Sequence, residues 1–171
     1  MPTRSQFLPD AVPLIARAGS GPMVRPFRCD TARIVVPANA TDGAYAILER
    51  VSQPGFSPPR HIHRREDEII HLLAGEVLVW CDGTSTALRP GDTATLPRGL
   101  PHSFRVMGIA PARMLLTIVP GGFERFFAAV ATLELPNDIP DLLDLGEAFG
   151  IDYVGPPLAE ADLQFRRGIR D

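Results

Sequence analysis

Two spaced blocks of histidine, glutamate, glycine and proline constrain the fold of this chain more than any other feature. The first block reads G-x(5)-H-x-H-x(4)-E-x(6)-G over residues 55–75, and the second reads G-x(5)-P-x-G-x(2)-H over residues 91–102. Strand-like stretches lie between them. A fold for this chain must bring the four side chains that can ligate a metal to one place, and these are His61, His63, Glu68 and His102.

The spacing within the first block predicts two strands joined by a turn. Side chains alternate faces along a strand, so His61 and His63 point the same way and can share one ion. Glu68 follows His63 by an odd number of positions and would face away on an unbroken strand. Residues 64–67 are all charged, which predicts a solvated turn that returns Glu68 to the inner face. By the same alternation His71 faces away and is not a ligand.

Three neutral imidazoles and one carboxylate suit one divalent transition metal per chain. Iron, manganese, nickel, copper and zinc all accept such a donor set, and the order of affinities does not choose among them. On an octahedral metal, four protein ligands leave positions for water, dioxygen or substrate, as catalysis requires.

The two blocks resemble the two halves of the cupin signature. The resemblance covers about residues 40–120, with Val106 standing where the second half usually closes with Asn. It implies an all-β fold, the double-stranded β-helix or jelly-roll barrel, and a scaffold that hosts many chemistries. The ligand positions are the four residues named above, and the framing positions are Gly55, Gly75, Gly91, Pro97 and Gly99.

The rest of the chain suggests three parts. Residues 1–30 are rich in proline and are expected to form an N-terminal arm. Residues 31–120 contain short β-rich runs separated by turn residues and are expected to form the barrel. Residues 121–171 are expected to form a helical extension packed on the barrel, because apolar residues recur there at helical spacing. Gly121 and Gly122 would allow the first of these helices to move as a lid.

Alternation also predicts a substrate pocket. If His102 faces the metal, Phe104 faces inward as well, and apolar residues of neighbouring strands would complete a chamber for an aromatic substrate. An alternative interpretation is that the same side chains simply fill the barrel. Arg60 or Arg98 could bind an anionic substrate, although solvation explains both. The predicted pocket residues are Ile70, Leu72, Phe104, Met114, Leu116 and Ile118.

The intact ligand set, the segment 120–124 and the helical tail resemble small cupins related to quercetin dioxygenases. That resemblance implies a dioxygenase that acts on an enolic or hydroxy-ketone aromatic, such as a flavonol. Glu68 would be the catalytic base that takes the hydroxyl proton. Two alternatives stay open, namely an oxygen-independent metal-dependent lyase or isomerase and a non-catalytic cupin that binds a small ligand.

Composition limits the partners and the chemistry. The formal net charge of −3 predicts no nucleic-acid surface, and no apolar run is long enough for a membrane span, so we expect a cytoplasmic protein with a small-molecule substrate. The chain contains no lysine, and its 17 residues of the Lys and Arg class are all arginines. This excludes Schiff-base and P-loop chemistry, which needs lysine. The strands 69–74 and 77–80 are apolar on both faces, and this favours a homodimer.

Overall fold

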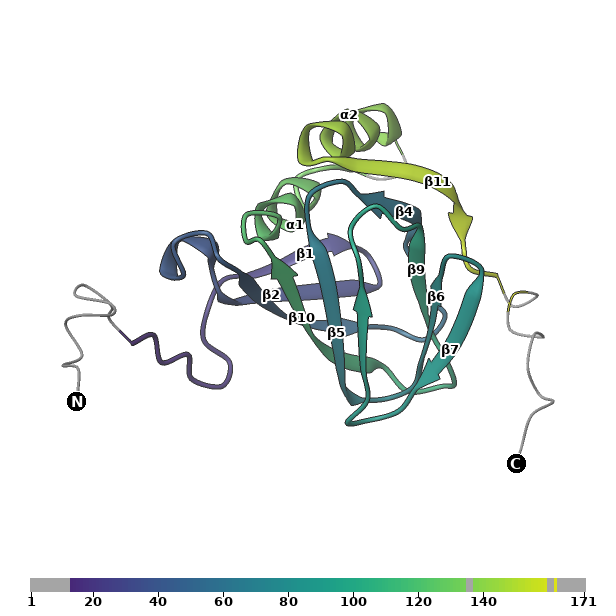
Figure 1. Cartoon of the computed structure of the whole chain (residues 1–171), viewed down its shortest axis with the longest axis horizontal. Helices are drawn as coiled ribbons and strands as arrows, with labels where there is room; N and C mark the ends of the chain where they lie inside the picture. The colour runs from purple at the N-terminus through teal and green to yellow at the C-terminus, as the bar shows by residue number, and fades with distance from the viewer. Residues whose placement is uncertain (1–12, 135–136, 160–161, 163–171) are drawn as a thin grey trace.

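The fold is built from two antiparallel sheets that pack face to face, with two α-helices at one end (Figure 1). The structure is a computed structural model, and it describes residues 13–134, 137–159 and 162. The six-stranded sheet has the order β1 (Met23–Phe27), β2 (Asp30–Val36), β3 (Ala46–Ser52), β10 (Ala112–Val119), β5 (Asp67–Ala74) and β8 (Thr93–Leu96). The five-stranded sheet has the order β11 (Ile151–Pro157), β4 (Pro59–His63), β9 (His102–Val106), β6 (Val77–Cys81) and β7 (Thr84–Leu88). The helices are α1 (Glu124–Val130) and α2 (Ile139–Phe149), and a short 3-10 helix spans Ala38–Ala40.

Strict alternation of side chains creates the core between the sheets. In β10, every second residue is buried from Ala112 to Ile118, and β3 and β5 follow the same pattern. The inward residues of the second sheet, such as Val79 and Phe104, meet them from the other side. Burial of this apolar surface is the main favourable contribution to folding.

The turn predicted after His63 is present. Strand β4 ends at His63 and β5 begins at Asp67, so the chain reverses within the intervening residues. Glu68 is then buried on the inner face of β5. His71 lies on the opposite face, where its Nδ1 is 2.8 Å from the Thr93 hydroxyl.

Gly75 shows why a glycine ends the first block. Its φ is +82°, and a Cβ at this position would lie 2.7 Å from the Pro111 carbonyl oxygen and 2.8 Å from the Ala112 Cα. Any other residue would therefore be strained in its backbone and would collide with the chain that enters β10.

The helices occur where the apolar spacing predicts them. Strand β11 then follows α2 directly, because Gly150 adopts a left-handed φ of +78° and reverses the chain there. The predicted helical extension thus contributes an edge strand to the second sheet, and the predicted N-terminal arm contains β1, which pairs with β2. The sheets extend beyond residues 31–120 on both sides, because β1 forms a hairpin with β2 and β11 pairs with β4, which is distant in sequence.

Within the described residues, no helix is long and apolar enough to cross a membrane. The cytoplasmic location stays a prediction.

Candidate metal centre and the adjoining cavity

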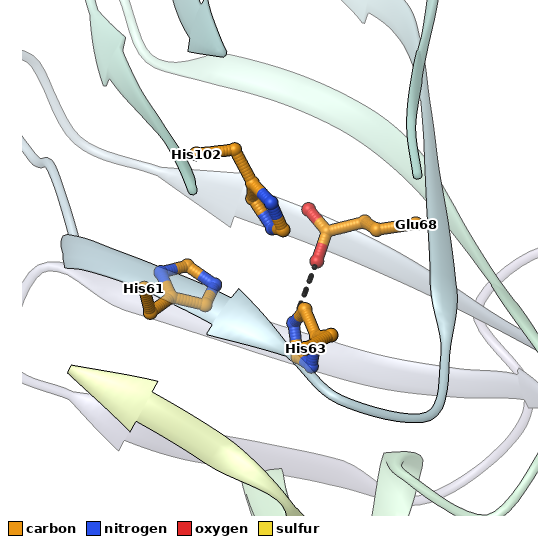
Figure 2. Close-up of side chains that lie close together, drawn as sticks. All are labelled: His61, His63, Glu68 and His102. Atoms are coloured by element: carbon orange, nitrogen blue, oxygen red, sulfur yellow. Dashed lines mark ion pairs between the residues drawn. The ribbon is translucent and has the colours of Figure 1, made fainter. Parts of the chain in front are cut away.

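Three strands bring the four predicted ligands together (Figure 2). His61 and His63 project from the same face of β4, and His102 at the start of β9 is the direct cross-strand partner of His61. Glu68 reaches the cluster from β5 in the opposite sheet. Figure 2 shows the three imidazoles and the carboxylate turned toward one another.

The geometry of the cluster suits a single metal ion. One potential ligand atom from each residue can be chosen so that all four lie within 4.8 Å of one another. His63 Nε2 and Glu68 Oε2 are 3.4 Å apart. His63, Glu68 and His102 are buried, whereas His61 is half-buried and lies nearer to solvent. Burying several polar groups together costs free energy unless they are compensated, and a bound metal would supply that compensation.

Backbone carbonyls set the orientation of two imidazoles. The Pro59 carbonyl lies 2.8 Å from His61 Nδ1, and the Leu100 carbonyl lies 2.9 Å from His102 Nδ1. A carbonyl only accepts, so both Nδ1 atoms carry the proton and both Nε2 atoms present a lone pair. His102 Nε2 is buried without a hydrogen-bond partner among the described residues. A buried nitrogen lone pair without a hydrogen-bond partner, close to three other potential metal ligands, fits a bound cation. Contacts such as those from the Pro59 and Leu100 carbonyls orient metal-ligating histidines.

The electrostatics favour the ligating form of three of the four residues, namely His61, Glu68 and His102. Burial, followed by repulsion from His63 and His102, lowers the pKa of His61 to about 3. Burial also lowers the pKa of His102. For Glu68, burial alone would raise the pKa, but the hydrogen bond from His63 and the charges of the surrounding imidazoles lower it to about 2. At neutral pH, His61 and His102 are therefore neutral and Glu68 is a carboxylate, which is the form that a divalent metal requires.

Glu66 is a neighbour of the candidate site that the sequence reasoning missed. It was expected in a solvated turn, but its side chain is buried, and burial raises its pKa. Its Oε2 lies 3.9 Å from His63 Nδ1, and neither atom has a hydrogen-bond partner within the described part of the chain. Glu66 is thus placed to become the outer partner of His63, as the two carbonyls are for His61 and His102.

A cavity of about 110 Å³ opens beside the cluster. His61, His63 and Glu68 line one part of it, and the buried Arg50 lines another. The remaining wall is largely aromatic, and its rings belong to Phe27, Phe104, Phe123, Phe126, Phe127 and Tyr153. The Phe123 ring packs edge-on against His63 with centroids 4.4 Å apart, so the aromatic wall begins directly at a ligand.

Elements outside the predicted barrel supply much of this wall. Tyr153 and Ile151 of β11 pair with His61 and His63 across the sheet edge, and α1 contributes Phe126 and Phe127. The helical spacing of the phenylalanines was visible in the sequence, but nothing local showed which surface they would cover.

Only one of the six predicted pocket residues lines the cavity. Phe104 lines the cavity. The other five are fully buried in the core between the sheets and do not line it, and they are Ile70, Leu72, Met114, Leu116 and Ile118. Their inward orientation was predicted correctly. They lie in the interior that side chains fill, in agreement with the alternative interpretation given above.

The arginines singled out in the sequence lie elsewhere. Arg60 pairs with Asp162 at 3.0 Å and stacks over Trp80, and Arg98 pairs with Asp67 at 2.9 Å. Neither lines the cavity. The basic residue that does is Arg50, whose inward position in β3 between Leu48 and Ser52 is a signal that alternation could have revealed.

Comparisons with known proteins agree with this arrangement. A family model described as the cupin domain matches residues 49–119. Quercetin 2,3-dioxygenase from Bacillus subtilis (strain 168) is 34% identical over 122 residues, which cover 70% of this chain and 35% of that enzyme. This chain therefore spans about a third of the length of that relative.

Solved structures share the fold at low sequence identity. KdgF from Halomonas sp. superposes with a TM-score of 0.60 at 16% identity, covering 67% of this chain and 99% of that one. An RmlC-like cupin from Shewanella frigidimarina superposes with a TM-score of 0.57 at 14% identity, covering 67% of this chain and 96% of that one. These likenesses confirm the predicted jelly-roll fold.

Proposed function

We propose that this chain, a cupin that resembles quercetin dioxygenase-like proteins, is a metal-dependent dioxygenase acting on an enolic or hydroxy-ketone aromatic. The observation that carries the proposal is the convergence of four potential ligand atoms within 4.8 Å at the edge of an aromatic cavity. The name of the relative supports the oxygenase chemistry, and the cavity wall supports an aromatic substrate.

In this proposal, His61, His63, Glu68 and His102 hold one divalent transition metal. When bound, the metal supplies Lewis-acid stabilisation of a substrate oxyanion and open positions for small ligands. The buried site keeps water away from the reacting group, and the aromatic rings hold the substrate ring by stacking and apolar contact.

Glu68 is the group that receives the hydroxyl proton of the substrate. In the structure its carboxylate faces His63 Nε2 at 3.4 Å, and this contact lowers its basicity. A divalent cation beside Glu68 would keep the carboxylate ionised, so proton transfer requires either a loosened bond between Glu68 and the metal or a second hydrogen bond that raises the basicity of Glu68.

Oxygen consumption distinguishes this function from its alternatives. Purified protein loaded separately with iron, manganese, nickel, copper or zinc is tested in an oxygen electrode with single-ring and three-ring hydroxy-ketones. We expect oxygen uptake that depends on metal and falls at least a hundredfold in Glu68→Gln, because removal of a general base typically costs a factor of about 10²–10⁴. Turnover without oxygen would instead support a lyase or isomerase, and binding without turnover would support a ligand-binding cupin.

We also infer that the chain forms a homodimer through the outer face of the six-stranded sheet. Ile69, Leu73 and Leu115 are half-buried on this face, where a monomer would be expected to present polar side chains. Light scattering coupled to size exclusion should give twice the mass of the chain. A monomeric mass at micromolar concentration would contradict the inference.

A further inference from the structure

The cavity contains a buried cation that the proposed chemistry does not use. The Arg50 side chain is 5% exposed, and its guanidinium lies 5.1 Å from the ring centroids of both Phe104 and Phe127. These rings and Arg50 line the same cavity as His63 and Glu68. Charged side chains are rarely buried unless they are paired, so the contacts of this arginine decide what it can do.

Arg50 is held firmly on one edge. Its Nη2 donates to Asp30 Oδ2 at 2.7 Å and its Nε donates to Asp30 Oδ1 at 3.3 Å. Asp30 is itself fixed by Ser52, whose hydroxyl donates to Oδ1 at 2.6 Å. The network places the guanidinium in one orientation before any ligand arrives, which reduces the entropy lost on binding.

The other edge of the guanidinium is not used by the described residues. Arginine carries five N–H donors, and the two bonds to Asp30 occupy two of them. Nη1 makes no hydrogen bond to any described residue, and the edge formed by Nη1 and Nη2 remains for an incoming acceptor. This edge matches the two oxygens of a carboxylate.

The size of the cavity limits the ligand. At about 110 Å³ it is smaller than an engineered apolar cavity of roughly 150 Å³ that accommodates benzene. A chain of aromatic contacts runs from His63 through Phe123 to Phe127, with ring centroids 4.4 and 5.7 Å apart, and ends at Arg50. The three rings of a flavonol exceed this space, and a single ring with a carboxylate fits only if its substituents reach beyond the enclosed volume toward the metal ligands and the arginine.

We infer that Arg50 selects the substrate, and that the cavity takes a single-ring hydroxy-ketone that carries a carboxylate opposite its hydroxyl group. This inference rests on the proposed function for the end of the ligand that faces Glu68. At the other end, the carboxylate accepts two hydrogen bonds from the free edge of Arg50, and the aromatic wall contacts the ring between them.

A matched pair of ligands tests the inference. Comenic acid is a single-ring hydroxypyranone with a carboxylate opposite the hydroxyl, and pyromeconic acid is the same ring without the carboxylate. Binding of each is measured by calorimetry to protein loaded with zinc, which is redox-inert and therefore separates binding from oxidation. Wild-type protein should bind comenic acid roughly 10–100-fold more tightly, the range expected for hydrogen bonds to a charged group.

Two variants test whether the preference for comenic acid over pyromeconic acid depends on Arg50. Arg50→Lys retains the charge beside Asp30 but lacks the second edge, so we expect the preference to disappear while pyromeconic acid still binds. The matched control is Arg113→Lys, which alters an exposed arginine paired with Glu49 outside the cavity and should retain the preference. Thermal unfolding and zinc content are measured on each variant to confirm that the fold and the metal site persist.

A second measurement covers the case in which Arg50→Lys does not fold. The methyl ester of comenic acid cannot pair with both N–H groups of the arginine edge and should bind wild-type protein like pyromeconic acid. Equal affinity of the acid and its ester, or a preference that persists in folded Arg50→Lys, would overturn the role of Arg50. A flavonol that binds as tightly as comenic acid would overturn the single-ring limit. Loss of zinc binding or of oxygen uptake reports on the proposed function instead, because neither measures the difference between the two ligands.

Discussion

Replacing Asp30 with asparagine should destabilise the protein far more than removing a charge from its surface. Asn has nearly the same shape as Asp, and its amide oxygen can still accept the Ser52 hydroxyl hydrogen bond. The change removes the only carboxylate that pairs with Arg50 among the described residues and directs an amide N–H toward a guanidinium N–H. Arg50 then keeps its charge at 5% exposure without a counterion.

The size of the expected stability loss follows from the burial of the Arg50–Asp30 ion pair. Removing one partner of a buried ion pair costs about 3–5 kcal/mol, because the remaining charge is uncompensated. A domain of this size loses roughly 2–4 °C in melting temperature per kcal/mol, so Asp30→Asn should lower the melting temperature by about 6–20 °C. The three aromatic rings around Arg50, at 5.1 to 5.7 Å, offset part of the loss by cation–π attraction and favour the lower half of this range.

Chemical and thermal denaturation of matched variants measure this effect. The control is Glu147→Gln, which breaks a pair with Arg64 at 2.8 Å whose side chains are 39% and 71% exposed, and which should cost less than about 1 kcal/mol. The double variant Asp30→Asn with Arg50→Met should regain part of the lost stability, since no charge is then left buried. A cost for Asp30→Asn no larger than that of the control, or no recovery in the double variant, would refute the reasoning.

Other predictions concern the metal ligands and their surroundings. His61→Ala and His102→Ala should each lose most bound metal by elemental analysis, while circular dichroism still shows the sheet signal. The control His71→Ala lies outside the cluster and should keep its metal. Full metal occupancy in both ligand variants would disprove the assignment. Glu66→Leu removes the outer partner of a ligand and should weaken metal affinity roughly 10–100-fold in competition with a chelator, and unchanged affinity would show that the 3.9 Å contact has no such role. Burial raises the pKa of Tyr153 from 10.0 to about 12, so the folded state binds this proton more tightly than the unfolded state does; the resulting stability is present below pH 10 and is lost as the pH rises toward 12. Ultraviolet titration of phenolate should show this late step in the wild type, and its persistence in Tyr153→Phe would contradict the assignment.

The convergence of the four candidate ligands could be predicted from the sequence because their positions depend largely on local rules. Alternation along β4 places His61 and His63 on one face, and the parity of the next strand requires a turn before Glu68. Both rules operate over a few residues and need no knowledge of the distant chain. The cross-strand partnership of His61 and His102 then follows from the fold that the motif implies.

The cavity could not be predicted in the same way, because its wall depends on long-range pairing. Tyr153 reaches the site only through the register of β11 against β4, and no local pattern fixes that register. Arg50 acquires its role from the pairing of Asp30 with Ser52 between β2 and β3, which buries all three side chains together. Glu66 was misread because a charged residue in a charged turn is usually solvated, and only the three-dimensional structure shows its carboxylate turned inward.

The division between the metal ligands and the aromatic wall has a consequence for how such a protein can diversify. All four ligands lie inside residues 49–119, whereas Phe123, Leu142 and Tyr153 belong to the segment that follows. Exchange of residues 121–157 with those of a homologue would therefore alter much of the aromatic wall and leave Arg50 and the four candidate metal ligands in place. The part of substrate selection that depends on the later aromatic side chains could then change without any change in the residues proposed to hold the metal.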